Sequence, residues 1–227
     1  MERISNHVKG RRSYDSRRRR DQARRNRSAV LETAERLFLT RGYAATTVAS
    51  IAEGADVSVE TVYKAFSGKP GLVRAIWEQG LAGVKEIPAP QRSDEMQQLE
   101  ADPRKVIENW GAFTTEVGPR AAPILLLIRN AASSDPQMAA LLQETDRARL
   151  ARMEDNARRL HERGHLREGV TLEHARDVLW TYSSPELYEL LVLRQRWPLE
   201  RYGRFVAEGI IAALLPQPGE VGTSPRE

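Results

Sequence analysis

The sequence predicts an all-α protein, in which a small N-terminal helical unit precedes a larger helical bundle. Apolar residues recur at the three- and four-residue spacing of amphipathic helices, and no segment alternates as a half-buried strand does. Helix-start pairs also divide the chain: Asp102-Pro103 and Asp135-Pro136 combine a capping aspartate with a proline suited to the first turn. We therefore expect two parts, each made of helices packed on helices.

Composition limits the class of protein. The chain has 227 residues, 41% hydrophobic and 29% charged, an ordinary balance for a protein with a buried core. It contains no cysteine, which excludes disulfides, thiolate metal sites and cysteine nucleophiles and fits a reducing compartment. No stretch approaches the roughly 20 apolar residues of a membrane span, and no apolar signal segment follows the N-terminus. We expect a soluble, cytoplasmic protein without a cofactor or a membrane partner.

The net charge of +4 is unevenly distributed. Residues 1–30 hold 11 Lys or Arg against three acidic residues, a net charge of +8, so the remainder is net −4. Residues 1–22 lack apolar periodicity and are interpreted as a disordered basic arm that contains the cluster Arg17–Arg20. Two readings of the arm stay open, a solvated tail and a segment that follows DNA phosphates or enters the adjacent minor groove.

Three short helices are expected after the arm. The first runs from about Arg24 to Gly42, and its apolar face is formed by Val30, Leu31, Ala34, Leu37 and Phe38. The second begins at Thr46 or Thr47, and Val48, Ile51, Ala52 and Ala55 share its face. The third spans Val59–Phe66 after Ser58 as N-cap, and it buries Val62 and Phe66.

This order is that of a helix-turn-helix, in which one helix braces on the phosphate backbone and the next enters the major groove. The side chains exposed on the third helix should then be short, polar or flat. Those that meet the description are Ser58, Glu60, Thr61, Tyr63 and Lys64.

A linker is expected where Pro88, Pro90 and a polar run to Asp94 interrupt the pattern. Beyond it the sequence predicts helices over residues 103–117, 121–132, 136–163, 172–196 and 198–215, with Gly118-Pro119 as a break. A disordered tail is expected over 216–227.

The N-terminal segment AVLETAERLFLTRGYAATTVASIAEGADVSVETVYKAFSGKPGLVRAIWE resembles the DNA-binding domain of the TetR family of bacterial transcriptional regulators. The matching motifs are A-x-x-L-F-x-x-x-G-Y, T-T-V-x-x-I-A, V-S-x-x-T-V-Y-x-x-F and K-x-x-L, over about residues 27–80. Two positions depart from the family pattern. Asp56 stands where the turn usually carries Gly, and Val59-Glu60 replaces a basic residue and Gly.

The resemblance implies a role for each matching residue. Thr47, Tyr63 and Lys69 would contact phosphate oxygens, and Ser58, Val59, Glu60, Thr61 and Lys64 would face bases or the adjoining backbone. For Tyr63 the alternative is a core aromatic. Glu60 would accept from a cytosine amine or repel other sequences.

The resemblance also implies the domain organisation: a disordered basic arm (1–22), a helix-turn-helix DNA-binding domain (23–68), a helical ligand-binding and dimerisation domain (69–215) and a disordered tail (216–227). In the body, S-P-E-L-Y at residues 184–188 and W-P-x-E-R-Y at 197–202 are similar to one large branch of the family. A homodimer would read a palindromic operator. Its interface would include Leu179, Leu187, Leu190, Leu191, Phe205, Ile210 and Ile211.

Family members usually enclose a small-molecule cavity in the body, and few fixed charges on the matching faces here favour a hydrophobic or aromatic effector. The candidate lining residues are Trp110, Phe113, Ile124, Leu127, Trp180 and Tyr182. The alternative for each is an ordinary core position.

A competing motif is His161-Glu162-Arg163-Gly164-His165, which fits the H-E-x-x-H pattern of zinc hydrolases. Two zinc ligands one turn apart need a continuous helix, whereas Gly164 is expected to end this one as a left-handed C′ residue. The sequence therefore favours a ligand-released repressor that is no enzyme and holds no metal. The alternatives are a ligand-independent regulator, a basic architectural DNA-binding protein and, remotely, a zinc hydrolase.

Overall fold

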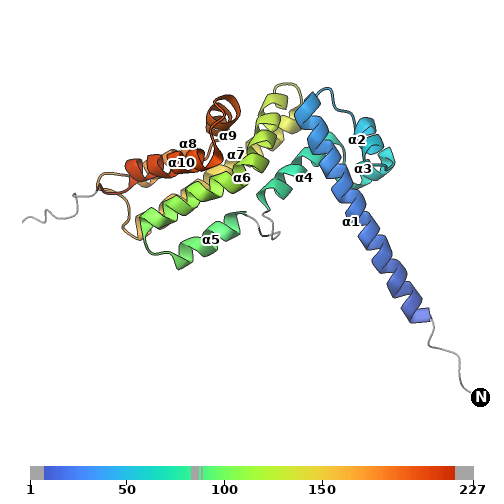
Figure 1. Cartoon of the computed structure of the whole chain (residues 1–227), viewed down its shortest axis with the longest axis horizontal. Coiled ribbons are helices and arrows are strands. Elements are labelled where there is room, and N and C mark those ends of the chain that lie inside the picture. The colour runs from blue at the N-terminus through green and yellow to red at the C-terminus, as the bar shows by residue number, and fades with distance from the viewer. Residues whose placement is uncertain (1–7, 83–86, 88, 218–227) are drawn as a thin grey trace, which may run out of the picture. The chain divides into compact units, whose positions relative to one another are not determined.

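The chain forms two compact units, Met1–Ile76 and Trp77–Glu227, whose regular elements are helices throughout the described part (Figure 1). This computed structural model describes residues 8–82, 87 and 89–217. The predicted all-α class is confirmed. No described helix combines the length and the apolar composition needed to cross a membrane.

The N-terminal unit contains α1 (Val8–Arg41), α2 (Val48–Gly54), α3 (Val59–Phe66) and the first two turns of α4 (Lys69–Leu81). Its core is the apolar face expected from the sequence, with Ala34, Phe38, Ile51 and Val62 almost completely buried. Burying such side chains stabilises a fold by about 1.5–3 kcal/mol each, except for the smaller alanine.

Helix α1 begins earlier than expected. Residues 8–22, interpreted from the sequence as part of a disordered arm, continue the helix without interruption, while residues 1–7 lie outside the described residues. Extending an existing helix needs no new nucleus, and arginine is a good helix former. Side chains one turn apart also bond here, since Gln22 Nε2 donates to Asn26 Oδ1 at 2.7 Å and Arg25 Nη2 to Gln22 Oε1 at 2.8 Å.

The boundary between the units falls within α4, after Ile76, rather than at the expected residue 68. Leu72 and Val73 are fully buried and belong to the N-terminal unit. The first two turns of α4 are therefore an integral part of the N-terminal unit, although the sequence assigned the whole helix to the body.

In the body, α6 (Pro103–Ala131), α7 (Pro136–Glu162), α8 (Leu172–Tyr182) and α10 (Leu199–Leu214) pack on one another, with α5 (Ala89–Leu99) and α9 (Pro185–Tyr188) against α6 (Figure 1). The expected starts at Asp102 and Asp135 are confirmed, because each aspartate caps its helix through a first-turn N–H. The polar run expected to form a linker before residue 95 is instead the first half of α5. The predicted tail lies outside the described residues from 218 on.

The expected break at Gly118-Pro119 is wrong, since α6 runs through both residues and through Pro123. Gly118 leaves room for the ring of Tyr188, whose nearest atom would lie 2.9 Å from an added Cβ. The Tyr188 ring of α9 occupies the space that a side chain at position 118 would fill. We infer that this packing compensates for the backbone hydrogen bonds that the prolines cannot donate.

Conversely, the helix expected over 172–196 is divided. Ser183 ends α8, Ser184 caps α9, and a π-helical segment η1 (Glu189–Arg194) follows. Serine caps compete with the helix for backbone groups, and a proline directly after a serine starts a new helix. The chain then reverses at Arg196, which has a φ of +56°.

Candidate nucleic-acid interface and effector cavity

Helix α3 buries two apolar side chains in the core and presents most of its other side chains to solvent. Val62 and Phe66 are buried, whereas Tyr63 is 54% exposed and Val59 is 42% exposed. Glu60 and Lys64 are also exposed, and Thr61 is half-buried. Tyr63 is therefore not a core aromatic. The exposed face contains most of the residues that the sequence assigned to DNA contact.

Side-chain caps fix the starts of α2 and α3. Thr47 Oγ1 accepts from the Ser50 N–H at 3.1 Å, and Ser50 Oγ accepts from the Thr47 N–H at 3.3 Å, a reciprocal capping box. Ser58 Oγ accepts from the Thr61 N–H at 3.1 Å and lies 2.8 Å from Thr61 Oγ1. The caps orient the first turn of α3 at the exposed end of the helix.

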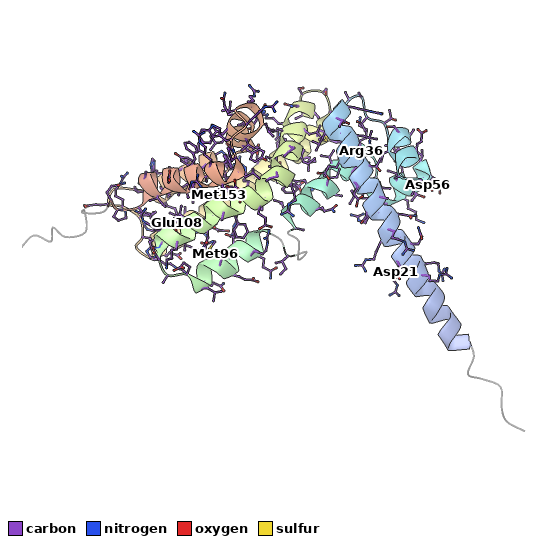
Figure 2. The ribbon with its side chains drawn as sticks, viewed as in Figure 1. Asp21, Arg36, Asp56, Met96, Glu108 and Met153 are labelled. Carbon is purple, nitrogen blue, oxygen red and sulfur yellow. The ribbon has the colours of Figure 1, made fainter. Side chains whose placement is uncertain are left out.

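The turn between α2 and α3 is closed by Asp56, labelled in Figure 2, which adopts a φ of +52°. Its N–H donates to the Glu53 carbonyl at 3.2 Å, and the Val57 N–H donates to the Ala52 carbonyl at 3.0 Å. These are the two bonds of a Schellman motif, which needs a left-handed residue. Aspartate, which accepts a left-handed backbone better than most residues, thus keeps the turn in place of the usual glycine.

Lys69 begins α4 and is held against the loop that follows α1. Its Nζ donates to the Tyr43 carbonyl oxygen at 2.6 Å and lies 4.1 Å from the centre of the Tyr43 ring. No local pattern in the sequence pairs these two residues. The contact fixes a positive charge beside the start of α4, within the same unit as α3.

The N-terminal half of α1 is strongly basic. Arg18, Arg19, Arg20, Arg24 and Arg25 are exposed on this helix, beyond the segment that packs against α2. The cluster at Arg17–Arg20 thus stands on a helix rather than on a flexible tail.

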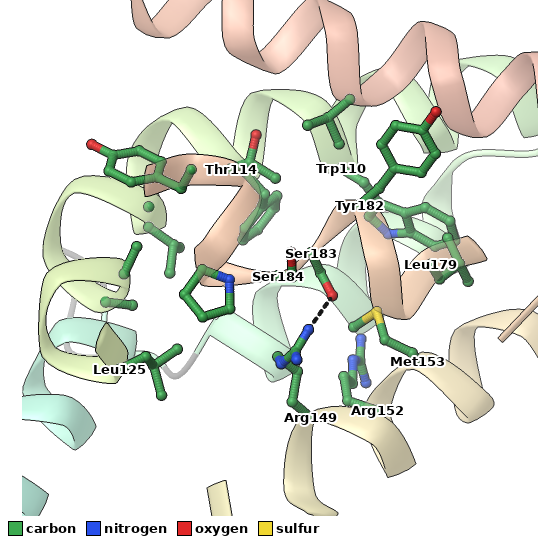
Figure 3. A pocket seen from close by; sticks show the side chains of 18 of the residues that line it. Trp110, Thr114, Leu125, Arg149, Arg152, Met153, Leu179, Tyr182, Ser183 and Ser184 are labelled. Atoms are coloured by element: carbon green, nitrogen blue, oxygen red, sulfur yellow. Dashed lines mark hydrogen bonds between the residues drawn. The ribbon is translucent and has the colours of Figure 1, made fainter. Parts of the chain in front are cut away.

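The body encloses a cavity of about 400 Å³ (Figure 3). Of the six candidate lining residues, Trp110, Phe113 and Tyr182 line it, but Ile124, Leu127 and Trp180 do not. The lining face of α6 follows the helical repeat through Trp110, Thr114, Val117, Ala121 and Leu125, and Ile124 and Leu127 point elsewhere. Trp180 instead stacks on the Arg149 guanidinium, whose carbon lies 3.3 Å from the ring centre.

The polar part of the cavity wall was not identified from the sequence. Arg149, Arg152 and Asn156 reach it from α7. Arg149 Nη1 donates to the Trp180 carbonyl at 2.9 Å and to Ser183 Oγ at 3.1 Å, the bond dashed in Figure 3. Arginines on a helix with this many charges usually lie on its solvated face. The signal was their spacing with buried Thr145 and Asn156, which follows a four-, three-, four-residue pattern.

The candidate dimer residues divide into two groups. Leu190 is 51% exposed and Phe205 is 37% exposed, and Leu187 and Leu191 are half-buried. Leu179, Ile210 and Ile211 are instead buried in the core of the body, so their side chains are not available to a second copy as the sequence predicted. Their helices already use these faces on one another. Leu193 on η1, which was not among the predicted residues, is also exposed.

The helix that carries the H-E-x-x-H motif ends inside it. Gly164 has a φ of +68°, its N–H donates to the His161 carbonyl at 2.9 Å, and the His165 N–H donates to the Leu160 carbonyl at 2.9 Å. This Schellman motif confirms Gly164 as the C′ residue and places His165 outside the helix. Burial and the charge on Arg163 both lower the pKa of His165. The described residues contain no group of three or more His, Cys, Asp or Glu side chains able to hold a metal ion.

The sequence profile of "Bacterial regulatory proteins, tetR family" matches residues 30–76 of this chain. The regulator TtgR of Pseudomonas putida is 43% identical over 60 residues, which span 26% of this chain and 29% of TtgR. The uncharacterised regulator YvkB of Bacillus subtilis is 44% identical over 50 residues, or 22% of this chain and 26% of YvkB. The matched segment is therefore less than a third of each of these relatives.

The fold is similar to solved structures over most of the chain. One is a SmeT–triclosan complex, with a TM-score of 0.66 and 23% identity over 89% of this chain and 99% of that one. Another is NalD, the secondary repressor of the MexAB-OprM multidrug efflux pump in Pseudomonas aeruginosa, with a TM-score of 0.68 and 20% identity over 86% and 98%. At these identities the likeness shows the fold alone.

Proposed function

We propose that this chain, which belongs to the tetR family of bacterial regulatory proteins, is a homodimeric repressor released from a palindromic DNA operator by a small molecule. The observation that carries the proposal is the face of α3, where exposed Glu60, Tyr63 and Lys64 stand on a helix capped at its N-terminus. A helix of this kind fits the major groove, which displays a distinct pattern of donors and acceptors for each base pair.

Contacts to the DNA backbone would come from α3 itself and from the helices on either side of it in the chain. Thr47 at the start of α2, Tyr63 on α3 and Lys69 at the start of α4 would bond phosphate oxygens and fix the register of the helix on the duplex. Ser58, Val59, Glu60, Thr61 and Lys64 would face bases or the adjoining backbone.

The basic half of α1 would add charge that is independent of sequence. Each phosphate that a protein cation neutralises makes the slope of log affinity against log salt more negative by about 0.9. We expect the triple substitution of Arg18, Arg19 and Arg20 by Gln to make that slope shallower and to leave the preferred sequence unchanged. An unchanged slope would favour a solvated helix without DNA contact.

A dimer is required if two half-sites of a palindrome are read. Exposed Leu190, Leu193 and Phe205 on η1 and α10 supply apolar surface for a second copy. Half-buried Leu187 and Leu191 lie on the same stretch of chain.

The cavity is the proposed effector site. Its volume lies within the range of small-molecule pockets, and apolar side chains form most of its wall. Two similar structures support this reading, since one is a complex with triclosan and the other is a repressor of an efflux pump. A repressor of this kind would work in the cytoplasm on chromosomal DNA.

The test is selection of genomic DNA fragments by the purified full-length chain. A recovered palindrome supports the proposal, and its flanking genes indicate the regulated function. Recovery of fragments without a consensus would instead indicate a basic architectural protein. A palindrome that no small molecule releases would indicate a ligand-independent regulator. Stoichiometric metal with a chelator-sensitive activity would favour the zinc hydrolase.

A further inference from the structure

The charged groups that line the effector cavity are all cationic. Arg149 and Arg152 lie on its wall, and no Asp or Glu does among the lining residues of the described chain. Both side chains rise from neighbouring turns of α7 toward the cavity (Figure 3). Burying a guanidinium is costly unless hydrogen-bond acceptors, a counter-charge or an aromatic face replace its hydration, so the partners of these two side chains determine what the cavity attracts.

Arg152 shares its carboxylate with a second arginine. Its Nη1 donates to Asp94 Oδ1 at 2.7 Å, and Arg159 Nη1 bonds the same oxygen. Burial acts to raise the pKa of Asp94, but the hydrogen bonds from Arg159 and Arg152 lower it, so this carboxylate is ionised and faces two cations. Arg152 Nη2 is buried and has no hydrogen-bond partner among the described residues. One positive charge is thus left uncompensated.

Arg149 is held by neutral acceptors, the Trp180 carbonyl and Ser183 Oγ. Its nearest carboxylate is Asp146, 3.9 Å away and half-exposed to water, which screens the attraction. Burial lowers the pKa of Arg149, as expected of a cation whose lost hydration is incompletely replaced. The two arginines together make the α7 side of the cavity electropositive.

Apolar side chains form most of the rest of the wall, among several hydroxyl groups and the Asn156 amide, and one further donor has no partner among the described residues. Phe113, Leu125, Met153 and Val206 line it together with the Trp110 indole, whose Nε1 is buried and has no acceptor among the described residues. A ligand oxygen that reaches these side chains would give the unpaired donors a partner, and an apolar chain would fill the remaining volume.

We propose that the cavity takes an amphipathic acid, whose carboxylate-type head bonds Arg152 beside Arg149 and whose apolar body lies against α6 and α10. The inference rests on the proposed function only in that the cavity is taken as the effector site. An anionic head forms charge-assisted hydrogen bonds that a neutral or cationic head of the same length does not.

The experiment compares decanoate, decanol and decylamine, which share an apolar chain and differ in head charge, by calorimetric titration of the full-length protein. Because decanoate is the better hydrated of the first two, an apolar cavity without a cationic site would prefer decanol. We expect decanoate to bind about tenfold more tightly than decanol and decylamine to bind most weakly. Equal binding of decanoate and decanol, or a preference for decanol, would overturn the inference.

Variants then locate the head. Arg152→Met should lower decanoate affinity about tenfold and change decanol affinity less than about twofold. Arg147→Met removes the same charge from an exposed position of α7 outside the cavity and should change neither. Ala148→Trp, at the exposed edge of the cavity, should weaken the binding of both decanoate and decanol. That result would exclude binding elsewhere on a basic surface. A preference for decanoate that survives Arg152→Met overturns the assignment.

Asp94 keeps Arg159 as a partner in the Arg152→Met protein, so the fold should persist. If that variant does not fold, the order of the three probes in the unaltered protein still decides. The DNA selection described above is read separately. A palindrome with no preference for the acid refutes this inference alone, whereas the preference without a palindrome supports the acid site and refutes the repressor.

Discussion

The candidate functional side chains of the N-terminal unit face solvent, whereas those of the body face an internal cavity. Helix α3 buries Val62 and Phe66 and presents Tyr63 and Lys64 to solvent. In the body, Arg149 and Arg152 line an internal cavity together with apolar side chains. An outward polar face can meet a polymer larger than the protein itself, whereas an inward one can meet only a molecule that fits the cavity.

The difference also separates function from stability. Exposed side chains of α3 take part in no core contact, so their loss should alter recognition and leave the fold intact. Side chains that line the cavity of the body also pack against their neighbours, so substitutions there should change stability and the shape of the cavity together.

The strongest test of this separation is Gly111→Ala in the body. An added Cβ at Gly111 would lie 2.4 Å from the Gly203 carbonyl oxygen, because α6 and α10 cross with their backbones in close contact. We expect a loss of about 3 kcal/mol of unfolding free energy, the upper end for overpacking, measured by thermal or urea unfolding. Ala112→Ser, at the exposed neighbouring position, should cost less than about 0.5 kcal/mol. A stable Gly111→Ala protein would show that the helices separate readily.

The second test compares opposite faces of α3. Val62→Ala should cost about 2 kcal/mol of unfolding free energy because it leaves a void in the core. Lys64→Ala should change stability by less than about 0.5 kcal/mol but weaken operator binding. If Lys64 contacts a phosphate, the slope of log affinity against log salt should become shallower by about 1. Unfolding curves and binding titrations at several salt concentrations measure both. Equal losses of stability would contradict the division into two faces.

A smaller effect is expected at Gly164, where the helix ends within the H-E-x-x-H motif. Gly164→Ala should cost about 1 kcal/mol of unfolding free energy, because alanine disfavours a left-handed backbone. Gly164→Asn should cost less, since asparagine accepts this conformation better. If alanine stabilised the protein instead, the helix would continue to His165 and the zinc reading would regain support.

The smallest effect concerns the carboxylate shared by Arg152 and Arg159. Since the pKa of Asp94 is lowered in the folded protein, its contribution to stability is present above the unfolded value of about 3.9 and is lost as the pH falls through the folded value. We expect the unaltered protein to unfold at a higher Tm than Asp94→Asn near neutral pH. The difference should shrink toward zero as the pH falls below about 4. A difference independent of pH would assign the effect to packing.

The core and the helix-turn-helix of the N-terminal unit were predictable because the residues that determine them are close together in the sequence. The apolar repeat of α1, the cap at Ser58 and the left-handed Asp56 each lie within a few residues of the structure that they determine. Helix α6 was mispredicted because Tyr188, some 70 residues away in sequence, supplies the packing on Gly118 that keeps the helix continuous. A glycine-proline pair in the sequence predicts a helix break but carries no information about a distant residue that packs against it.

The cavity was only partly predictable for the same reason. Trp110, Phe113 and Tyr182 were found because large aromatics tend to lie inside, but that rule does not tell which side of a buried helix faces a void. Arg149 and Arg152 were missed because arginine on a charged helix is normally solvated. Their helical spacing with Thr145 and Asn156 indicates one shared face, but the packing of α7 against its neighbours is needed to show that this face points inward.

The continuity of α1 ties the direction of its arginines to the core of the N-terminal unit. From Val30 back to Val8 the helix extends about 33 Å, and each residue is turned by about 100° from the one before it. The packing of Phe38 in the core fixes the rotation of the helix about its axis, and a continuous helix transmits that rotation to its N-terminal half. One alanine inserted at position 26 would preserve charge and helicity, yet rotate Arg18, Arg19, Arg20, Arg24 and Arg25 by more than a quarter of a turn relative to the core. A flexible tail would tolerate that change, whereas a continuous helix aligned with one DNA groove would not.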